Sequence, residues 1–240
     1  DLALLNETLN TAAAQAARYG YTIHYALKAN ANPALLKIIS GAGFGADCVS
    51  GNEIKVALKN GFKPQGIVFA GVGKTDWEIE YAIEQNIQCI HCESVQEFQV
   101  IEQIAQKLNK TASIALRINP NVDANTHKSI TTGLKENKFG MSAEEASLIL
   151  NSANKYKNIN LVGLHFHIGS QIMNMEVFKN LALEVNRIQD RLQSKALPYL
   201  NLGGGLGIDY INPRINRIAD FAGYFKTINQ WLNPGKEQTI

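Results

Sequence analysis

A lysine at the carboxyl end of a short apolar segment is the first residue that could do chemistry. Lys28 lies within Tyr25–Asn30. A lysine that leaves an apolar strand is expected to be partly desolvated, which favours the neutral amine. A neutral amine can form a Schiff base with an aldehyde. An ordinary solvated loop lysine would do no chemistry, and Lys28 alone does not separate these two interpretations.

A glycine run follows the last apolar segment. Gly203, Gly204 and Gly205 lie within Leu202–Gly207. Without Cβ atoms, a backbone can approach an anion closely and point N–H groups at it. Loops after the seventh and eighth strands of (β/α)8 barrels often bind phosphate. A tight turn needs the same residues, so the placement of this run is what indicates a phosphate cradle.

Two histidines and a serine close another apolar segment. His165 and His167 share a face, because side chains two apart on a strand point the same way. They could bind a metal, or they could divide into a core histidine and one that stacks on a ring. Ser170, just past the strand, could donate to a phosphate oxygen.

An acid and an arginine end two further segments. Asp47 lies in Gly45–Ser50, where a carboxylate could bond a lysine or a cofactor hydroxyl, although aspartates are common in turns. Arg117 has a guanidinium that fits phosphate or carboxylate, and a structural salt bridge is the alternative. A lysine, glycine cradle, histidine and serine together fit an aldehyde cofactor with a phosphate arm.

The cysteines indicate neither disulfides nor a metal. Cys48, Cys89 and Cys92 are an odd, low number, which argues against a disulfide framework and for a reducing cytoplasm. Cys89 and Cys92 read C-x-x-C, but in the strand predicted over 88–93 residues three apart point to opposite faces. A zinc site needs four convergent ligands, and no second pair follows.

The elements that must position these residues alternate along the chain. Predicted strands are short apolar runs, many rich in β-branched or aromatic residues. They cover 22–29, 44–49, 66–71, 88–93, 112–119, 161–168 and 199–203. Predicted helices cover 35–42, 51–60, 76–85, 94–108, 142–153 and 176–194. Three of them open on start signals. These signals are Asn32-Pro33, Thr75 with Glu78, and Ser94 with Glu97.

This alternation predicts an α/β fold with parallel strands and right-handed crossovers. With Gln238–Ile240 as the start of an eighth strand, residues 1–240 are expected to form one TIM-type (β/α)8 barrel domain. An open doubly wound sheet is the alternative. The barrel is favoured because polar residues at strand ends would meet at one mouth. These residues are Lys28, Asp47, Glu93, Arg117, His167 and Gly203–Gly205.

Composition narrows the class. The 240 residues are 45% hydrophobic and 18% charged, which suits one soluble domain with a sizeable core. The net charge of +2 is scattered, so neither nucleic acid nor a membrane surface is an expected partner. No apolar run approaches the roughly 20 residues of a membrane span, and no leader is visible. A cytoplasmic protein is expected.

Several segments together resemble the alanine-racemase-like barrel of pyridoxal-phosphate enzymes, in its amino-acid decarboxylase branch. They are Tyr25–Asn30, Gly45–Ser50, His165–Gln171 and Asn201–Gly207. The string Thr126–Lys135, followed by Asn137–Gly140, is similar to a loop of diaminopimelate decarboxylases that ornithine and arginine decarboxylases lack. The resemblance spans nearly the whole chain and is thin only over about 212–236.

The resemblance implies pyridoxal 5'-phosphate as the cofactor. It implies Lys28 as the Schiff-base lysine and His167 as the histidine that stacks on the pyridine ring, and these are the implied catalytic residues. No metal is implied. The remaining implied cofactor-binding residues are Asp47, Arg117, Ser170, Gly203, Gly204 and Gly205.

The family continues beyond this barrel. It has a Glu-Pro-Gly-Arg segment whose glutamate pairs with the pyridine nitrogen, and a β-rich domain that supplies substrate groups, partly across a dimer. Neither is present among these residues, nor is the strand expected before Asp1. The chain is therefore expected to be one domain, truncated before the final strand and the β domain, of a homodimeric enzyme.

The implied activity is that of a pyridoxal-phosphate-dependent carboxy-lyase acting on a small-molecule amino acid. It would convert meso-2,6-diaminopimelate to L-lysine and carbon dioxide, the last step of lysine biosynthesis, and residues 1–240 alone are expected not to turn over. The alternatives are a decarboxylase of another basic amino acid such as ornithine or arginine, a non-catalytic carrier of the cofactor, and a barrel enzyme for a phosphorylated sugar.

Overall fold

A computed structural model describes residues 1–122 and 139–240. The string Thr126–Lys135 lies outside the described residues, as do Asn137 and Lys138. The chain divides into two compact units, and each is described by itself. Unit 1 comprises Asp1–Tyr21, Asn119–Phe139 and His165–Ile240, and unit 2 comprises Thr22–Ile118 and Gly140–Leu164.

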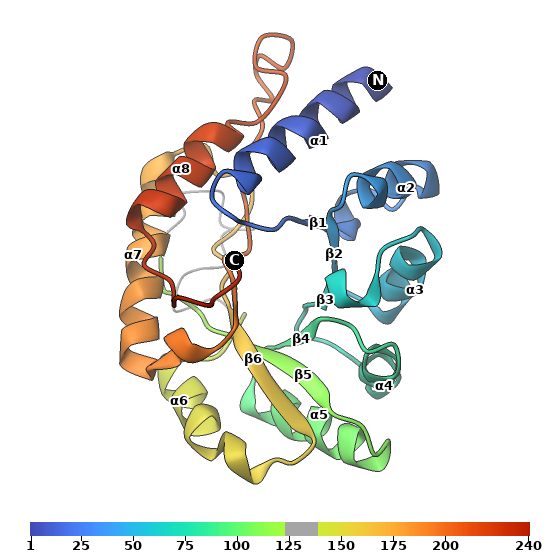
Figure 1. The fold of residues 1–240 in the computed structure, drawn as a ribbon, viewed down its shortest axis with the longest axis vertical. Helices are drawn as coiled ribbons and strands as arrows, with labels where there is room; N and C mark the ends of the chain where they lie inside the picture. Colours follow the sequence, from blue (N-terminus) through green and yellow to red (C-terminus); the bar gives the residue numbers. More distant parts are fainter. Residues whose placement is uncertain (123–138) are drawn as a thin grey trace. The chain divides into compact units, whose positions relative to one another are not determined.

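The strands are parallel and follow one another in chain order (Figure 1). Their bounds are His24–Ala26 (β1), Gly45–Cys48 (β2), Ile67–Phe69 (β3), Cys89–Cys92 (β4), Ala112–Arg117 (β5), Ile159–His165 (β6) and Tyr199–Asn201 (β7). A doubly wound sheet reverses its strand order at a switch point. The unbroken order therefore fits the predicted (β/α)8 type, and the α/β class is confirmed.

Helices flank the strands of unit 2 on their outer side, as Figure 1 shows for α2 to α5. Their bounds are Pro33–Gly41 (α2), Gly51–Lys59 (α3), Asp76–Glu84 (α4), Val95–Lys107 (α5) and Ala143–Ser152 (α6). The predicted start signals are confirmed. Asn32 caps α2 with proline in its first turn, and the hydroxyl of Ser94 accepts from Glu97 N at 3.1 Å.

The core of unit 2 explains why its strands read as short apolar runs. Every residue of β3 and of β4 is buried, as expected for parallel strands covered on both faces. On α5 the buried residues Phe98, Ile101 and Ala105 recur every three to four positions, which forms one apolar stripe.

Unit 1 contains three long helices and β7. Their bounds are Leu2–Ala17 (α1), Met175–Leu192 (α7) and Phe221–Trp231 (α8). Helix α8 packs against α1 and α7 (Figure 1). The ring of Tyr224 on α8 meets Phe178 on α7 edge to face, with centroids 4.7 Å apart. Thr239 bridges to Tyr199 in parallel, as predicted for the start of an eighth strand.

Several predicted bounds are wrong. The strand predicted over 22–29 ends at Ala26, because the chain turns into the short 3-10 helix Leu27–Ala29. The strands predicted over 161–168 and 199–203 end at His165 and Asn201, where the glycine-rich segments begin. Helices α1 and α8 were not predicted at all. Further 3-10 turns cover Pro64–Gly66, Ala153–Lys155 and Ser194–Ala196.

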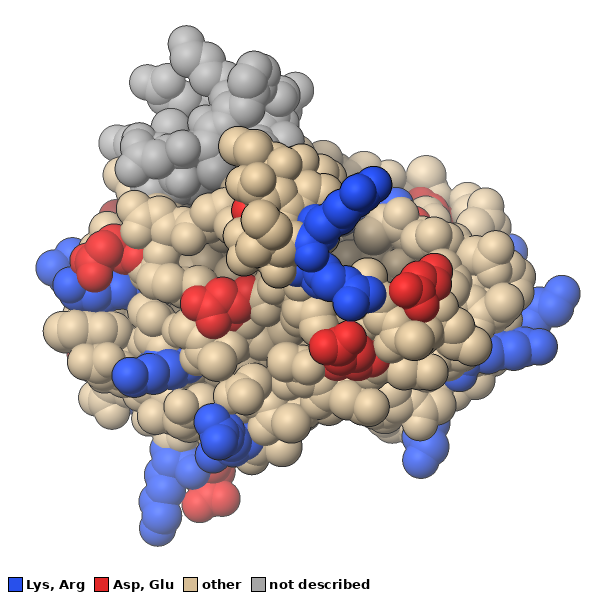
Figure 2. Space-filling view, turned by 90° about the horizontal axis from the view of Figure 1, so that it is seen from above, with Lys and Arg blue, Asp and Glu red and all other residues tan. Residues whose placement is uncertain are grey.

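Among the described residues, no helix is both long and apolar enough to cross a membrane. On the face drawn in Figure 2, basic and acidic side chains are interspersed and do not gather in one patch. This agrees with the scattered charge expected from the sequence.

Candidate functional site

Lys28 lies in the 3-10 turn that follows β1. In the described part of the chain it is exposed, so the prediction of a partly desolvated lysine at a strand end is wrong. The reason is local, because the chain leaves the extended conformation after Ala26. The hydroxyl of Tyr25 donates to the carbonyl of Asn30 at 3.2 Å across this turn. Lys28 is therefore open to solvent.

Asp47 is a half-buried residue of β2 whose Oδ1 is shielded from solvent, and it pairs in register with Ala26 of β1. Its Oδ1 has no hydrogen-bond partner among residues 1–122 and 139–240. Burial raises the pKa of Asp47 to about 6, while the charges of Lys28 and Arg117 oppose that rise and the charge of Glu53 adds to it. An unpaired buried acceptor whose charged form is favoured by two cations fits a bound group that brings a hydrogen-bond donor.

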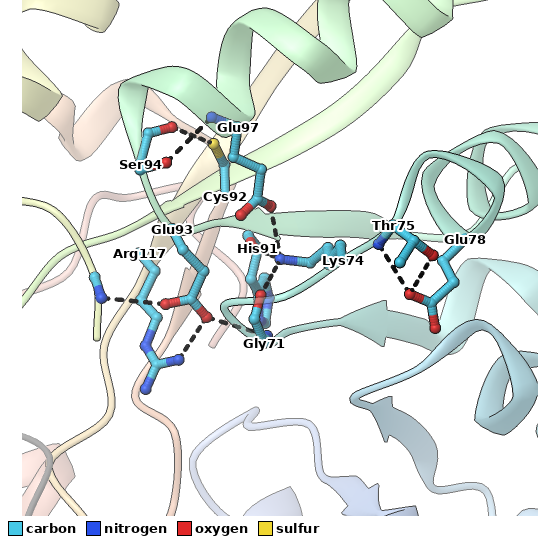
Figure 3. Close-up of polar contacts among 11 residues, drawn as sticks. Gly71, Lys74, Thr75, Glu78, His91, Cys92, Glu93, Ser94, Glu97 and Arg117 are labelled. Carbon is cyan, nitrogen blue, oxygen red and sulfur yellow. Dashed lines mark hydrogen bonds and ion pairs between the residues drawn. The ribbon is translucent and has the colours of Figure 1, made fainter. Parts of the chain in front are cut away.

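Arg117, at the end of β5, forms a buried ion pair with Glu93 (Figure 3). Oε1 of Glu93 accepts from Arg117 Nη1 at 2.5 Å and from Gly71 N at 3.1 Å. Oε2 accepts from Gly140 N at 3.1 Å. Glu93 was expected at a strand end, and no role was predicted for it. The sequence feature that indicates this ion pair is an acid and a base at the ends of two successive predicted strands.

A second buried ion pair, of Lys74 with Glu97, lies on the other side of the β4 terminus (Figure 3). Lys74 Nζ donates to Glu97 Oε1 at 2.7 Å, to Gly71 O at 2.7 Å and to His91 O at 2.8 Å. Sequence reasoning missed this lysine. All three ammonium protons are used, so Lys74 holds structure together and does not compete with Lys28 for an aldehyde.

In unit 1, His167 faces the turn formed by Gly203, Gly204 and Gly205, which is called the glycine turn below. Its Nδ1 lies 2.8 Å from Gly203 O, so this nitrogen carries the proton and donates to the carbonyl. His165 is 5% exposed, as expected for a core histidine. Among the described residues no group of three potential ligands could hold a metal ion.

Glycine is required in this turn for two different reasons, backbone conformation and close approach of another segment. Gly203, Gly204 and Gly205 have positive φ of 76°, 68° and 98°. A Cβ at Gly203 would collide with Phe166 O, and one at Gly205 would collide with Gly169 O. A Cβ at Gly204 would meet nothing within 4 Å. The outer two glycines allow close chain crossing, and Gly204 borders open space.

Ser170 is exposed on the segment that crosses the glycine turn. Backbone hydrogen bonds tie the two segments together, from Ile172 N to Gly205 O at 3.0 Å and from Gly207 N to Ile172 O at 2.9 Å. Ser170 and Gly204 thus belong to one structure held by backbone hydrogen bonds. This fits the chemistry of a phosphate site, which needs hydroxyl and N–H donors.

The predicted residues fall into two groups, each within one unit. Electrostatic interactions connect Asp47 with Lys28 and Arg117 in unit 2. In unit 1, hydrogen bonds connect His167 and the segment of Ser170 with the glycine turn.

A parallel α/β fold of (β/α)8 type, with chemically active groups after its strands, is the class that these features define. A family described as "Pyridoxal-dependent decarboxylase, pyridoxal binding domain" matches residues 2–238. The chain belongs to this family, whose cofactor is pyridoxal phosphate.

Similar proteins carry a consistent name. A diaminopimelate decarboxylase of Bacteroides thetaiotaomicron is 47% identical over 243 residues, which cover 100% of this chain and 63% of the relative. One from Helicobacter pylori strain J99 is 45% identical over 83% of this chain and 50% of its own length.

Solved structures of amino-acid decarboxylases are similar to this chain. The crystal structure of diaminopimelate decarboxylase from Helicobacter pylori complexed with L-lysine has a TM-score of 0.92 and 39% identity, over 100% of this chain and 60% of that one. The arginine decarboxylase of Paramecium bursaria Chlorella virus has a TM-score of 0.78 and 25% identity, over 98% and 60%. The chain thus spans less than two thirds of the length of these proteins.

Proposed function

We propose that the protein containing this chain is a pyridoxal-phosphate-dependent carboxy-lyase that converts meso-2,6-diaminopimelate to L-lysine and carbon dioxide, the last step of lysine biosynthesis. The observation that carries the proposal is 47% identity along the whole chain to a protein named diaminopimelate decarboxylase. A similar solved structure contains L-lysine, the product of the proposed reaction.

Lys28 is proposed to hold the cofactor covalently through its amine. The bound cofactor supplies the electron sink for loss of the carboxylate. Asp47, with its unpaired Oδ1, is proposed to accept a hydrogen bond from the Lys28 nitrogen or a cofactor hydroxyl. Arg117 is proposed as a cofactor-binding residue whose charge, after that of Lys28, opposes the rise that burial causes in the pKa of Asp47.

His167 is proposed as the second catalytic residue, stacking on the cofactor ring. Its hydrogen bond to Gly203 O fixes the imidazole plane, which supports this role. Gly203, Gly204 and Gly205, with Ser170, are proposed to bind the phosphate through N–H and hydroxyl donors. The open space beside Gly204 supports the approach of an anion there.

Three further properties also belong to the proposal. Residues 1–240 form one domain of the barrel, the full-length protein is a homodimer, and it works in the cytoplasm. Three free, buried cysteines support a reducing compartment. Light scattering of the full-length protein tests the dimer, and a single monomeric mass would contradict it.

Carbon dioxide release tests the reaction. The full-length protein with added pyridoxal phosphate is offered meso-diaminopimelate, lysine, ornithine and arginine in parallel. Release from diaminopimelate alone is expected. Release from ornithine or arginine would retain the cofactor and overturn the substrate. No release from any of them, with cofactor bound, would identify a carrier.

A further inference from the structure

The carboxylate of Glu93 brings together donors from separate segments of unit 2. Besides the guanidinium of Arg117, it accepts backbone N–H groups from Gly71, just past β3, and from Gly140. Glu93 and Arg117 are 6% and 7% exposed. A buried acid that satisfies one cation and two amides has little freedom to move, and charge-assisted hydrogen bonds of this kind are the strong ones.

The register explains why these two residues meet. Cys92 of β4 pairs with Leu116 of β5, so Glu93 and Arg117 follow as neighbours at the ends of adjacent parallel strands. The backbone closes the arrangement, because Met141 N donates to Arg117 O at 2.9 Å. The carboxylate of Glu93 therefore binds Gly140 N, and the carbonyl of Arg117 binds Met141 N.

Arg117 in turn acts on Asp47. The titratable or charged groups that interact with Asp47 are Lys28 on the 3-10 turn, Arg117 on β5, Glu53 on α3, and the buried thiols Cys48 and Cys89. Burial favours the neutral carboxyl, and the two cations favour the carboxylate. The position of the Arg117 charge therefore influences whether Asp47 is ionised near neutral pH.

We propose that Glu93 is a positioning residue, which fixes the Arg117 guanidinium so that its charge acts on Asp47 beside Lys28. The inference rests on the proposed function in one respect, that Asp47, Arg117 and Lys28 serve the cofactor. Glu93 itself contacts none of the reacting groups and acts through Arg117.

The Lys74–Glu97 pair offers a matched control. It is also a buried ion pair beside the end of β4, and the side-chain amine of Lys74 donates to the backbone carbonyl of Gly71 (Figure 3). Lys74 is not among the charges that shift the pKa of Asp47. Glu97→Gln therefore weakens a comparable ion pair without altering the charges around Asp47.

The sign of the effect separates the explanations. If Glu93 acted on Asp47 as a nearby negative charge, Glu93→Gln would remove repulsion and lower the pKa of Asp47. If Glu93 acts by holding Arg117, Glu93→Gln loosens the cation and raises the pKa of Asp47. A purely structural brace would leave the titration of Asp47 unchanged.

The experiment follows the 13C carboxyl signal of Asp47 against pH in the cofactor-free full-length protein, assigned with Asp47→Asn. Glu93→Gln is expected to raise the midpoint by about one unit, and Glu97→Gln to leave it in place. In the Arg117→Gln background, Glu93→Gln is expected to add nothing. The double variant loses one positive and one negative charge, so neither partner of the ion pair remains buried and unpaired. It can therefore be measured even if Arg117→Gln alone fails to fold.

A lowered or unchanged midpoint in Glu93→Gln, or an equal rise in Glu97→Gln, would overturn the positioning role. Carbon dioxide release by the wild-type protein is measured separately. Because the Asp47 titration needs neither cofactor nor turnover, a protein that fails to decarboxylate still gives a clear result for Glu93.

Discussion

Neighbouring glycines of one turn differ in what a methyl group would meet. Gly204 and Gly205 both have positive φ, which costs an L-residue about 1–2 kcal/mol. Gly205→Ala adds a collision with the carbonyl of Gly169, whereas Gly204→Ala adds none. We predict that Gly205→Ala lowers the free energy of unfolding more than Gly204→Ala, as measured by urea denaturation. Equal losses would show that backbone conformation alone requires these glycines.

Asp47 makes stability depend on pH. Burial raises its pKa from 3.8 to about 6, so between these values the folded state binds more protons than the unfolded state and stability falls as pH rises. Asp47→Asn does not titrate. We predict that its stability relative to wild type increases by up to about 3 kcal/mol between about pH 4 and about pH 7.

Urea unfolding of the cofactor-free protein across that pH range checks this prediction. Exposed Asp76, in the first turn of α4, provides the control in Asp76→Asn. A constant difference between Asp47→Asn and wild type would mean that the carboxyl of Asp47 is solvated.

Residue types were easier to predict than residue contacts. A lysine and an acid after neighbouring strands were visible in the sequence, and the charge of Lys28 does lower the pKa of Asp47. The partnership of Glu93 with Arg117 depends on the register of β4 and β5, which spacing along one strand does not contain. The exposure of Lys28 likewise depends on where β1 ends.

At the scale of elements, one carboxylate joins two helices. Glu78 of α4 accepts from Thr75 N at 2.9 Å at the start of its own helix and from Gly51 N at 2.8 Å at the start of α3. Burial acts to raise the pKa of Glu78, but these hydrogen bonds outweigh it and the pKa is lowered. The carboxylate therefore satisfies N–H groups at two helix termini.

We predict that Glu78→Ala lowers the free energy of unfolding by about 1 kcal/mol at neutral pH, since partial exposure screens the charge. A lowered pKa contributes stability above the unfolded-state pKa, and this is lost as pH falls through the folded-state value. The difference from wild type should therefore shrink in acid. Glu84→Ala, exposed on the same helix, is the control in thermal unfolding. A pH-independent loss would indicate packing instead of capping.

Element types were predictable where local signals were strong. Helices α2 to α7 match the predicted ranges closely because their caps and apolar stripes are local. Helix α1 also carried a signal, since the buried residues Leu9, Ala12 and Ala16 recur at helical spacing. Strand ends were less predictable, because the hydrogen bonds that end a ladder come from neighbouring strands.

At the scale of the whole molecule, the chain order of strands was inferable from alternation, because crossovers place successive parallel strands side by side. The division into two compact units was not inferable. It depends on contacts of α1 with α8, which are far apart in the sequence. The chain spans 63% of the length of its Bacteroides relative.

Binding of the cofactor is expected to stabilise the folded protein. A ligand that binds only the folded state stabilises it by about 2.7 kcal/mol at a hundredfold excess over Kd. We predict that pyridoxal phosphate raises the thermal unfolding midpoint of the full-length protein, and that Lys28→Ala removes most of the rise because the covalent link is lost. Lys59→Ala, an exposed lysine on α3, should retain it. Inorganic phosphate should give a smaller rise that Lys28→Ala leaves intact, since the glycine turn is unchanged. An equal response of Lys28→Ala and wild type to pyridoxal phosphate would contradict the role of this lysine and restrict cofactor binding to phosphate contacts.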